Sequence, residues 1–336
     1  MSEIVTEESI GPQGLETQAE LQQELQDGLP DRYAIKQQIG RGGMATVFLA
    51  EESQPARKVA IKVLDPDVTT RLTRRRFLRE IEVVSGLIHP HIVPIFAAGE
   101  AGELLYYVMP FIEGETVRHC LARVGALEAD EALHIAWDVA DALHYAHNHG
   151  VIHRDIKPEN ILLSGGHAVV ADFGIARAIT CADCGEEIQP ITQAGLPIGT
   201  PLYMSPEQAA GDADMDGRTD VYSLGCVLYE MLTGEAPYAG GTMFEIMMRH
   251  SQAPVPKVKT PVGSPPAAIR RSIAKAMSKD PADRFETAGE FAEALRMSRA
   301  SVDAQAISGN RVWTGIVVAG AFLALATAAV LLLIGN

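Results

Sequence analysis

Several charged and polar side chains surround a short turn near the middle of the chain. Two apolar runs, at 161–163 and 168–171, flank a Ser-Gly-Gly sequence, and this pattern predicts a β-hairpin. The polar groups on either side of the hairpin are Asp155, Lys157, Asn160 and Asp172. A hairpin would bring these two carboxylates, the amide and the ammonium group to one edge. Because hard cations prefer oxygen ligands, these residue types predict a site for a polyanion and its metal ion.

The order of these residues resembles the catalytic core of a protein kinase. The motifs that carry the resemblance are His153-Arg154-Asp155, Asn160 and Asp172-Phe173-Gly174. The alternative, solvated loop charges, would require the whole ordered series to arise by chance. The resemblance extends over about residues 33–298. The Lys-Pro-Glu sequence after Asp155 and the Gly199-Thr200 sequence resemble the corresponding motifs of serine/threonine kinases. The Gly-Gly-Met-Ala loop and the Ser-Pro-Glu-Gln-Ala sequence resemble those of the bacterial membrane-anchored group of that branch.

The resemblance implies phosphoryl transfer from ATP to Ser or Thr hydroxyls of proteins, in which catalysis is mostly positioning and charge neutralisation. Asp155 would accept or orient the hydroxyl proton of the substrate. Lys157 would neutralise charge on the moving γ-phosphoryl group. Asn160 and Asp172 would coordinate Mg²⁺, with Mn²⁺ as an alternative.

The segment before residue 110 contains mostly strand-like runs and one glycine-rich turn. Small residues in that turn would let backbone N–H groups approach phosphate oxygens. The predicted strand 59–62 ends in Lys62. The glycine-rich turn and this strand together resemble the nucleotide loop and the lysine strand of kinases. Ala45 replaces the third glycine of the loop. The resemblance implies nucleotide contacts in this region from Ile39, Gly40, Arg41, Gly42, Gly43, Met44, Ala45, Val47, Ala60 and Lys62.

Residues 71–87 are expected to be helical, because apolar residues recur there at three- and four-residue spacing. These residues are Phe77, Ile81 and Val84. Glu80 resembles the glutamate that pairs with the nucleotide lysine, here Lys62. An exposed helix acid is the structural alternative, and Glu82 is the other candidate partner. The position of Glu80 beside the apolar face favours Glu80.

The resemblance implies an adenine pocket where two lobes meet. Residues 110–114 would form the hinge, and Pro110 has no N–H to offer the base. The residues implied around the adenine are Met109, Phe111, Ile112, Val47, Ala60 and Leu162. Beyond the hinge, residues 130–147 have a helical stripe, and residues 220–229 are apolar nearly all round, which predicts a buried central helix. By resemblance Asp220 would anchor the catalytic loop, and Arg284 would pair with Glu207.

The expected fold is therefore α+β, a bilobal protein kinase fold with one C-terminal transmembrane helix. A small β-rich N-lobe with one main helix would occupy 33–109, and a larger helical C-lobe would occupy 115–298. Residues 1–32, rich in Glu and Gln, are expected to be a mostly disordered segment without a signal peptide, with a fraying helix at 15–25 as the alternative. Residues 299–311 would be a juxtamembrane segment.

Residues 312–334 contain no charged side chain, and as a helix they would span about 34 Å, enough for one bilayer crossing. A buried core helix is the alternative. Arg296, Arg299 and Arg311 precede the span, which predicts an inner-membrane protein with its kinase domain in the cytoplasm. Two residues follow the span, so no extracellular sensor domain is expected. The Ala-rich part, 324–329, permits close packing of two helices in a homodimer.

The segment 174–205 corresponds to the activation segment of kinases. Thr192 is the expected regulatory phosphosite, with its phosphate held by Arg154. Cys181 and Cys184 form one isolated CxxC pair. A loop insertion, a redox pair and a zinc half-site completed by another subunit are its three interpretations, and the insertion is favoured because one pair lacks specificity.

Other function classes are disfavoured. The net charge of -15 argues against a general nucleic-acid binder. Four histidines lie close in sequence, but no cysteine or acid completes a ligand set, and His153 is expected to be a packed core residue. These histidines are His144, His147, His149 and His153. A pseudokinase acting as a membrane-tethered ATP-binding scaffold is the main rival. It is disfavoured because Lys62, Asp155, Asn160 and Asp172 are all present.

Overall fold

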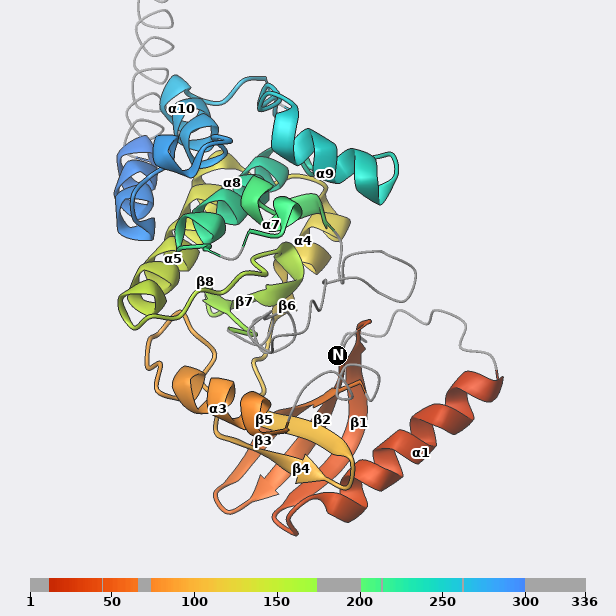
Figure 1. The fold of residues 1–336 in the computed structure, drawn as a ribbon. Coiled ribbons are helices and arrows are strands. Elements are labelled where there is room, and N and C mark those ends of the chain that lie inside the picture. The colour runs from red at the N-terminus through yellow and green to blue at the C-terminus, as the bar shows by residue number, and fades with distance from the viewer. Residues whose placement is uncertain are drawn as a thin grey trace, which may run out of the picture.

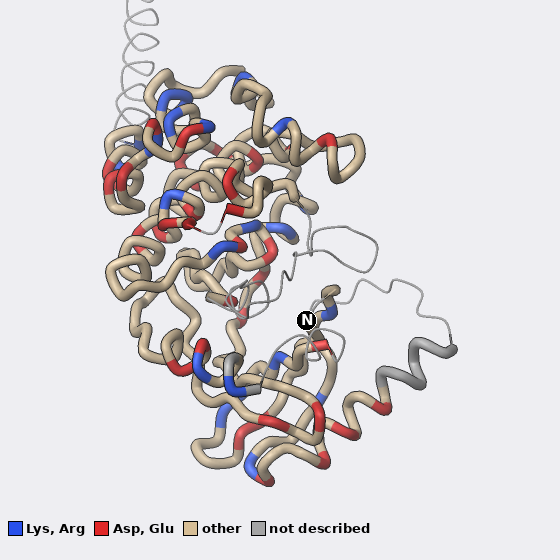
Figure 2. The backbone as a smooth tube through the Cα atoms, in the orientation of Figure 1, with Lys and Arg blue, Asp and Glu red and all other residues tan. Residues whose placement is uncertain are grey.

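The computed structural model describes residues 12–43, 45–65, 74–173, 201–212, 214–261 and 263–299. They form a small lobe built on a β-sheet and a larger lobe built on helices (Figure 1). Basic and acidic residues are interspersed over both lobes (Figure 2). None of the helices in these ranges is both long and apolar enough for a bilayer crossing. The expected membrane span, 312–334, lies outside them.

The small lobe contains a five-stranded antiparallel sheet of order β1-β2-β3-β5-β4. Its strands are β1 (Tyr33–Arg41), β2 (Ala45–Ser53), β3 (Ala56–Leu64), β4 (Ala97–Ala101) and β5 (Leu104–Pro110). Helix α3 (Arg74–Ser85) lies on one face, where Phe77 and Ile81 pack with Leu64 and Leu105. The expected helix at 71–87 is therefore confirmed for 74–85.

The expectation of a mostly disordered N-terminal segment is wrong for residues 12–28, which form helix α1 (Pro12–Gly28). A polar helix is marginal alone, and tertiary packing stabilises this one. Leu25 is fully buried against the sheet, with Leu29 beside it. The side chain of Gln26 accepts the Ile35 N–H at 2.8 Å and donates to the Tyr33 carbonyl at 3.0 Å. Gln26 thereby covers backbone groups of an edge strand.

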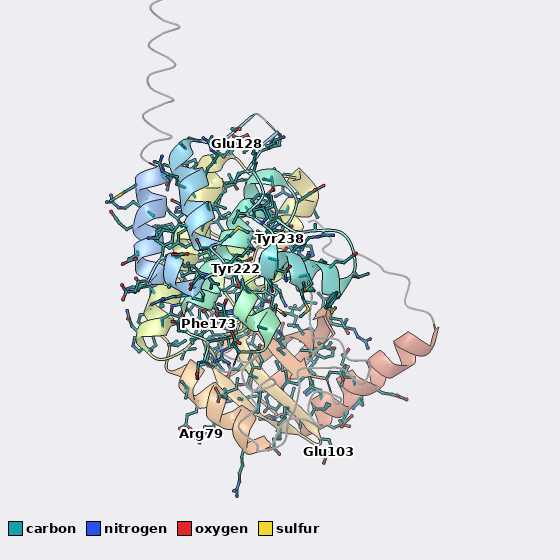
Figure 3. All side chains as sticks on the ribbon, turned by 45° about the horizontal axis from the view of Figure 1, so that its top comes forward. Arg79, Glu103, Glu128, Phe173, Tyr222 and Tyr238 are labelled. Carbon is teal, nitrogen blue, oxygen red and sulfur yellow. The ribbon has the colours of Figure 1, made fainter. Side chains whose placement is uncertain are left out.

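The large lobe is organised around α8 (Arg218–Thr233), which is buried almost throughout and confirms the expected central helix. Helix α5 (Ala129–Asn148) packs against α8, and its predicted apolar stripe is buried. The other α-helices among the described residues of this lobe are α4 (Val117–Val124), α7 (Pro206–Ala210), α9 (Met243–Gln252), α10 (Ala267–Ala276) and a last helix at 288–299. Phe173 lies at the side of this lobe that faces the sheet, whereas Tyr222 and Tyr238 lie inside it (Figure 3).

A three-stranded sheet, β6 (Glu115–Thr116), β7 (Ile161–Ser164) and β8 (His167–Val170), lies where the lobes meet. The predicted hairpin is confirmed, and its turn consists of Gly165 and Gly166, with φ of 60° and 85°. A two-residue hairpin turn of this type requires a positive φ angle at both residues, and glycine adopts such angles without strain. A Cβ at Gly114 would lie 2.0 Å from the Leu163 carbonyl oxygen, so only glycine allows the hinge to contact β7 this closely.

Candidate active site

Helix α8 fixes the position of the loop 149–160, which connects α5 to β7. Asp220, fully buried at the start of α8, accepts the backbone N–H groups of His153 and Arg154, each at 2.8 Å. His147 Nε2 lies 2.8 Å from the same carboxylate. Burial opposes the charge, but His147 and the N–H groups lower the pKa of Asp220. Asp220 thus anchors the loop as expected, and it supports Arg154 at a strained φ of 67°.

His153 is a packed core residue, as its sequence context indicated. Its Nε2 lies 2.8 Å from the Ala171 carbonyl oxygen, and its ring meets Phe173 edge-on. The other three neighbouring histidines have separate partners. His147 contacts Asp220, His149 lies 2.8 Å from the Tyr145 carbonyl, and His144 lies 3.2 Å from the Asn148 amide. None of the four belongs to a candidate metal-ligand cluster among the described residues.

The loop brings three of the expected catalytic and metal-binding side chains together. Lys157 Nζ donates to Asp155 Oδ2 at 2.6 Å. Asn160, which is buried, donates its amide to the same Oδ2 at 3.0 Å and to the Asp155 carbonyl at 2.8 Å. The Asp155 side chain stays 44% exposed, so it can accept a proton from a molecule entering from solvent. Because Asn160 uses its nitrogen here, its amide oxygen remains available to a cation.

Asp172 follows β8 and adopts a left-handed φ of 66°. Its Oδ2 accepts a 2.5 Å ionic hydrogen bond from Lys62, and its Oδ1 accepts a 2.6 Å hydrogen bond from the Tyr107 hydroxyl. Burial opposes ionisation, but the Lys62 charge and these hydrogen bonds hold the pKa of Asp172 below its ordinary value. The carboxylate is therefore ionised at neutral pH, as a metal ligand must be.

The strand registers explain why these residues meet. Lys62 pairs with Val47 on one side and with Tyr107 on the other, so the three side chains share one face of the sheet. Ala60 and Met109 form the next cross-strand pair on that face. The sequence analysis did not single out Tyr107. The only available signal was its position two residues before Met109, which places both side chains on the same side of a strand.

The expected pairing of Lys62 with Glu80 is not found among the ion pairs of the described residues. Lys62 instead pairs with Asp172. The Asp172 carboxylate is also bonded to the Tyr107 hydroxyl at 2.6 Å, which holds it within reach of Lys62. Glu80 lies on α3, beside the buried Ile81.

The glycine-rich turn links β1 and β2, with the Gly42 N–H bonded to the Ala45 carbonyl at 2.9 Å. The remaining nucleotide-site candidates lie on these strands, on the hinge and on β7. Met44, Thr192, Cys181 and Cys184 lie outside the described residues.

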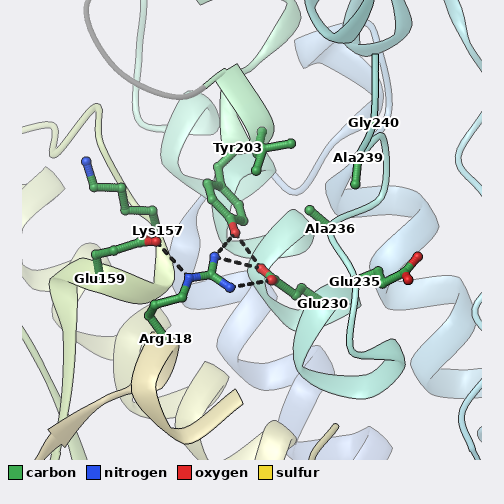
Figure 4. A pocket seen from close by; sticks show the side chains of 10 residues that line it. Arg118, Lys157, Glu159, Tyr203, Glu230, Glu235, Ala236, Ala239 and Gly240 are labelled. Carbon is green, nitrogen blue, oxygen red and sulfur yellow. Dashed lines mark hydrogen bonds and ion pairs between the residues drawn. The ribbon is translucent and has the colours of Figure 1, made fainter. Parts of the chain in front are cut away.

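Arg118, on α4, forms an ion-pair network beside the catalytic loop (Figure 4). It bonds Glu159 and Glu230, each at 2.7 Å, and it also contacts the Tyr203 hydroxyl. Tyr203 in turn donates to Glu230 at 2.5 Å. These groups line a cavity of about 720 Å³ together with Lys157, Leu202, Glu235, Ala236, Ala239 and Gly240. Lys157, a candidate catalytic residue, therefore lines this cavity.

A second ion pair fixes the segment 201–210 on the large lobe. Arg284 bonds both carboxylate oxygens of Glu207, at 2.6 and 2.7 Å, in the buried pair that was expected. Burial opposes the charge, but Arg284 lowers the pKa of Glu207. Gln208, one residue on, donates to the Arg154 carbonyl at 2.8 Å. This segment and the loop 149–160 are thus directly connected.

Comparisons with known proteins agree with this geometry. The family model for the protein kinase domain matches residues 33–296. The serine/threonine-protein kinase PknB of Mycobacterium tuberculosis is 42% identical over 270 residues, which cover 78% of this chain and 42% of that protein. PknJ of Mycobacterium bovis is 43% identical over 270 residues, covering 78% of this chain and 44% of PknJ. The chain thus spans less than half the length of these relatives. The match covers most of the chain itself, and the chain belongs to the protein kinase family.

Proposed function

We propose that this chain transfers the γ-phosphoryl group of ATP to serine or threonine hydroxyls of proteins. The observation that carries the proposal is the joint placement of Asp155, Lys157 and Asn160 on one loop, with the Lys62–Asp172 pair on the sheet side. The names of the relatives support the Ser/Thr class.

The residues present fit a magnesium ion. Asp172 is an ionised carboxylate, and Asn160 keeps an amide oxygen available, which together provide the oxygen ligands that Mg²⁺ prefers. When bound, the ion would neutralise charge between the phosphate groups. Lys62 would bind the α- and β-phosphates, with Glu80 orienting it once Asp172 takes up the metal.

Asp155 would orient the acceptor hydroxyl and accept its proton, because its exposed carboxylate is fixed by Lys157 and Asn160. Lys157 would neutralise charge on the transferring group. The acceptor segment would enter by the cavity beside Lys157, where Arg118 already neutralises two glutamates. The turn 39–47 and the hinge would hold the nucleotide.

We also propose that Thr192 is autophosphorylated and that Arg154 binds its phosphate. Arg154 Nε is buried and has no hydrogen-bond partner among the described residues, so it is ready to bind an anion. Mass spectrometry of the expressed protein should find phosphate between Gly174 and Ser205. The isolated pair Cys181 and Cys184 is proposed to be an insertion, so replacing both with serine should leave activity unchanged.

The span 312–334 is proposed to anchor the chain in the inner membrane, with the domain 33–298 in the cytoplasm. Its lack of charge and the preceding arginines support this. Full-length protein should remain with membranes after alkaline extraction, whereas a chain ending at 310 should be released.

The activity is tested by incubating the full chain with Mg-ATP labelled on the γ-phosphate. Phosphoserine or phosphothreonine should form in the chain itself or in an added protein, and Asp172→Asn should abolish it. ATP binding without any transfer would favour the pseudokinase scaffold instead.

A further inference from the structure

A second cluster of titratable side chains lies outside the site described above. His91 comes from the segment between α3 and β4, Asp138 from α5, and His167 from the start of β8. One ligand atom from each lies within 4.8 Å of the other two. Three elements far apart in sequence thus aim two imidazoles and a carboxylate at one point.

Asp138 is the centre of the cluster. Its side chain is completely buried, and its Oδ2 accepts the Ala168 N–H at 2.8 Å. Its Oδ1 has no hydrogen-bond partner among the described residues. A buried carboxylate oxygen without a hydrogen bond is costly, because the charge has lost its water and no N–H or O–H replaces it at close range. Two histidine nitrogens lie within ion-pair distance of the carboxylate: His91 Nε2 is 3.6 Å from Oδ1, and His167 Nδ1 is 3.4 Å from Oδ2.

The orientation of His91 identifies which of its nitrogens is available. Its Nδ1 lies 2.8 Å from the Ala168 carbonyl oxygen. A carbonyl can only accept, so Nδ1 donates to it, and Nε2 is the nitrogen that faces Asp138. A histidine that binds a metal through one nitrogen usually donates its other N–H to a carbonyl or carboxylate, which fixes the ring. His91 has this arrangement.

A third imidazole lies at the edge of the cluster. His134 Nε2 is 3.9 Å from Asp138 Oδ2, and the His134 and His167 rings are 5.4 Å apart. His134 Nε2 also lies 3.2 Å from the Gly166 carbonyl oxygen, so binding a metal would require it to turn away from that contact. A water molecule would therefore complete a tetrahedral site, because His134 is held by the Gly166 carbonyl and by Arg299, which lies 3.3 Å from its Nδ1.

We propose that His91, Asp138 and His167 form a Zn²⁺ site. Two imidazoles and one carboxylate are a donor set that zinc accepts, and a charge of +2 would stabilise the Asp138 oxygen that lacks a hydrogen bond. The ion would join the segment after α3 to α5 and to the β7–β8 hairpin. Asn160 precedes this hairpin and Asp172 follows it, so zinc would stiffen the support of the candidate active site. The backbone already joins these parts, since the Val170 N–H bonds the His91 carbonyl at 2.9 Å.

The test is a zinc titration of the metal-stripped full chain, carried out in a Cys181→Ser, Cys184→Ser background so that these cysteines cannot contribute. His167→Ala is the diagnostic variant, because His167 is exposed and its loss leaves the core intact. His119→Ala, an exposed histidine on α4, is the matched control. Binding stoichiometry, the thermal midpoint and the visible absorption of bound Co²⁺ are measured without reference to kinase activity.

One zinc ion per chain should bind and raise the thermal midpoint, and Co²⁺ should give the intense bands of a tetrahedral site. His167→Ala should weaken zinc binding at least about ten-fold, and His119→Ala should not change it. His91→Gln, which can keep a bond to the Ala168 carbonyl, should repeat the loss. Absence of a stoichiometric site, or a site that survives both His167→Ala and His91→Gln, would overturn the proposal.

Discussion

The Tyr107 hydroxyl donates a 2.6 Å hydrogen bond to Oδ1 of Asp172, while Lys62 occupies Oδ2. A metal ion bound by Asp172 would have to share or displace these partners. Tyr107→Phe should therefore lower the Mg²⁺ concentration for half-maximal phosphoryl transfer, by about five-fold for one hydrogen bond of about 1 kcal/mol. The same variant should lose about 1 kcal/mol of unfolding free energy, because Asp172 loses a buried partner.

Tyr106→Phe is the matched control for this variant. Tyr106 is the preceding residue on β5, is also buried, and packs in the other core of the small lobe. Tyr106→Phe should leave the Mg²⁺ dependence of phosphoryl transfer unchanged. A higher Mg²⁺ requirement in Tyr107→Phe would show that Tyr107 instead prepares Asp172 for the metal.

Arg118 is expected to be important for stability because Glu230 is only 5% exposed. Arg118→Ala would leave that buried carboxylate with Tyr203 alone and should cost about 2 kcal/mol of unfolding free energy. Arg123 lies on the same helix and pairs with Glu115, but its side chain is 61% exposed. Arg123→Ala should hardly change stability, since water screens such pairs. Denaturant unfolding of both variants measures the difference, and equal losses would refute the argument.

His250 should make stability depend on pH. Burial, followed by the charge of Lys279, lowers the pKa of His250 from 6.5 to about 4. The unfolded chain therefore binds a proton that the folded chain excludes, and stability falls as pH drops from about 6.5 toward 4. Between pH 7 and pH 5 this contributes about 1–2 kcal/mol.

His250→Gln should remove that part of the pH dependence, and an exposed-site control, His119→Gln, should keep it. Urea unfolding at the two pH values provides the comparison. Three groups face His250. The Tyr222 hydroxyl lies 2.9 Å from His250 Nδ1, the Tyr238 ring packs edge-on against the imidazole, and Lys279 Nζ donates to the His250 backbone carbonyl at 2.6 Å. If the free energy of unfolding of His250→Gln changes with pH as much as that of the wild type, another group causes the effect.

Local patterns were sufficient to predict much of the fold. The β7–β8 hairpin follows from two apolar runs around Gly165 and Gly166, and α8 follows from a run that is apolar all round. These elements are determined by their own residues. Helix α1 is not, because its residues are polar and its stability depends on burying Leu25 and bonding Gln26 to β1.

The site was predictable where its residues are close in sequence and less so where distant elements meet. Asp155, Lys157 and Asn160 lie on one short loop. The Tyr107–Asp172 bond joins residues 65 positions apart, and the Arg118–Glu230 pair joins residues 112 positions apart. A tyrosine on a buried strand or an arginine on a short helix carries no local sign of such a partner. The pairing of Lys62 depends on which carboxylate the fold brings within reach of its ammonium group, and no sequence pattern reports that.

The most direct test of the central claim measures ATP binding and phosphoryl transfer in the same preparations of wild type, Asp155→Asn and Lys62→Met. Wild type should label Ser or Thr residues from γ-labelled Mg-ATP. Asp155→Asn should still bind ATP but lose transfer by about 10²-fold or more, because the acceptor hydroxyl loses its base. Lys62→Met should lose transfer and weaken ATP binding. Transfer at the wild-type rate in Asp155→Asn would contradict the proposed kinase mechanism.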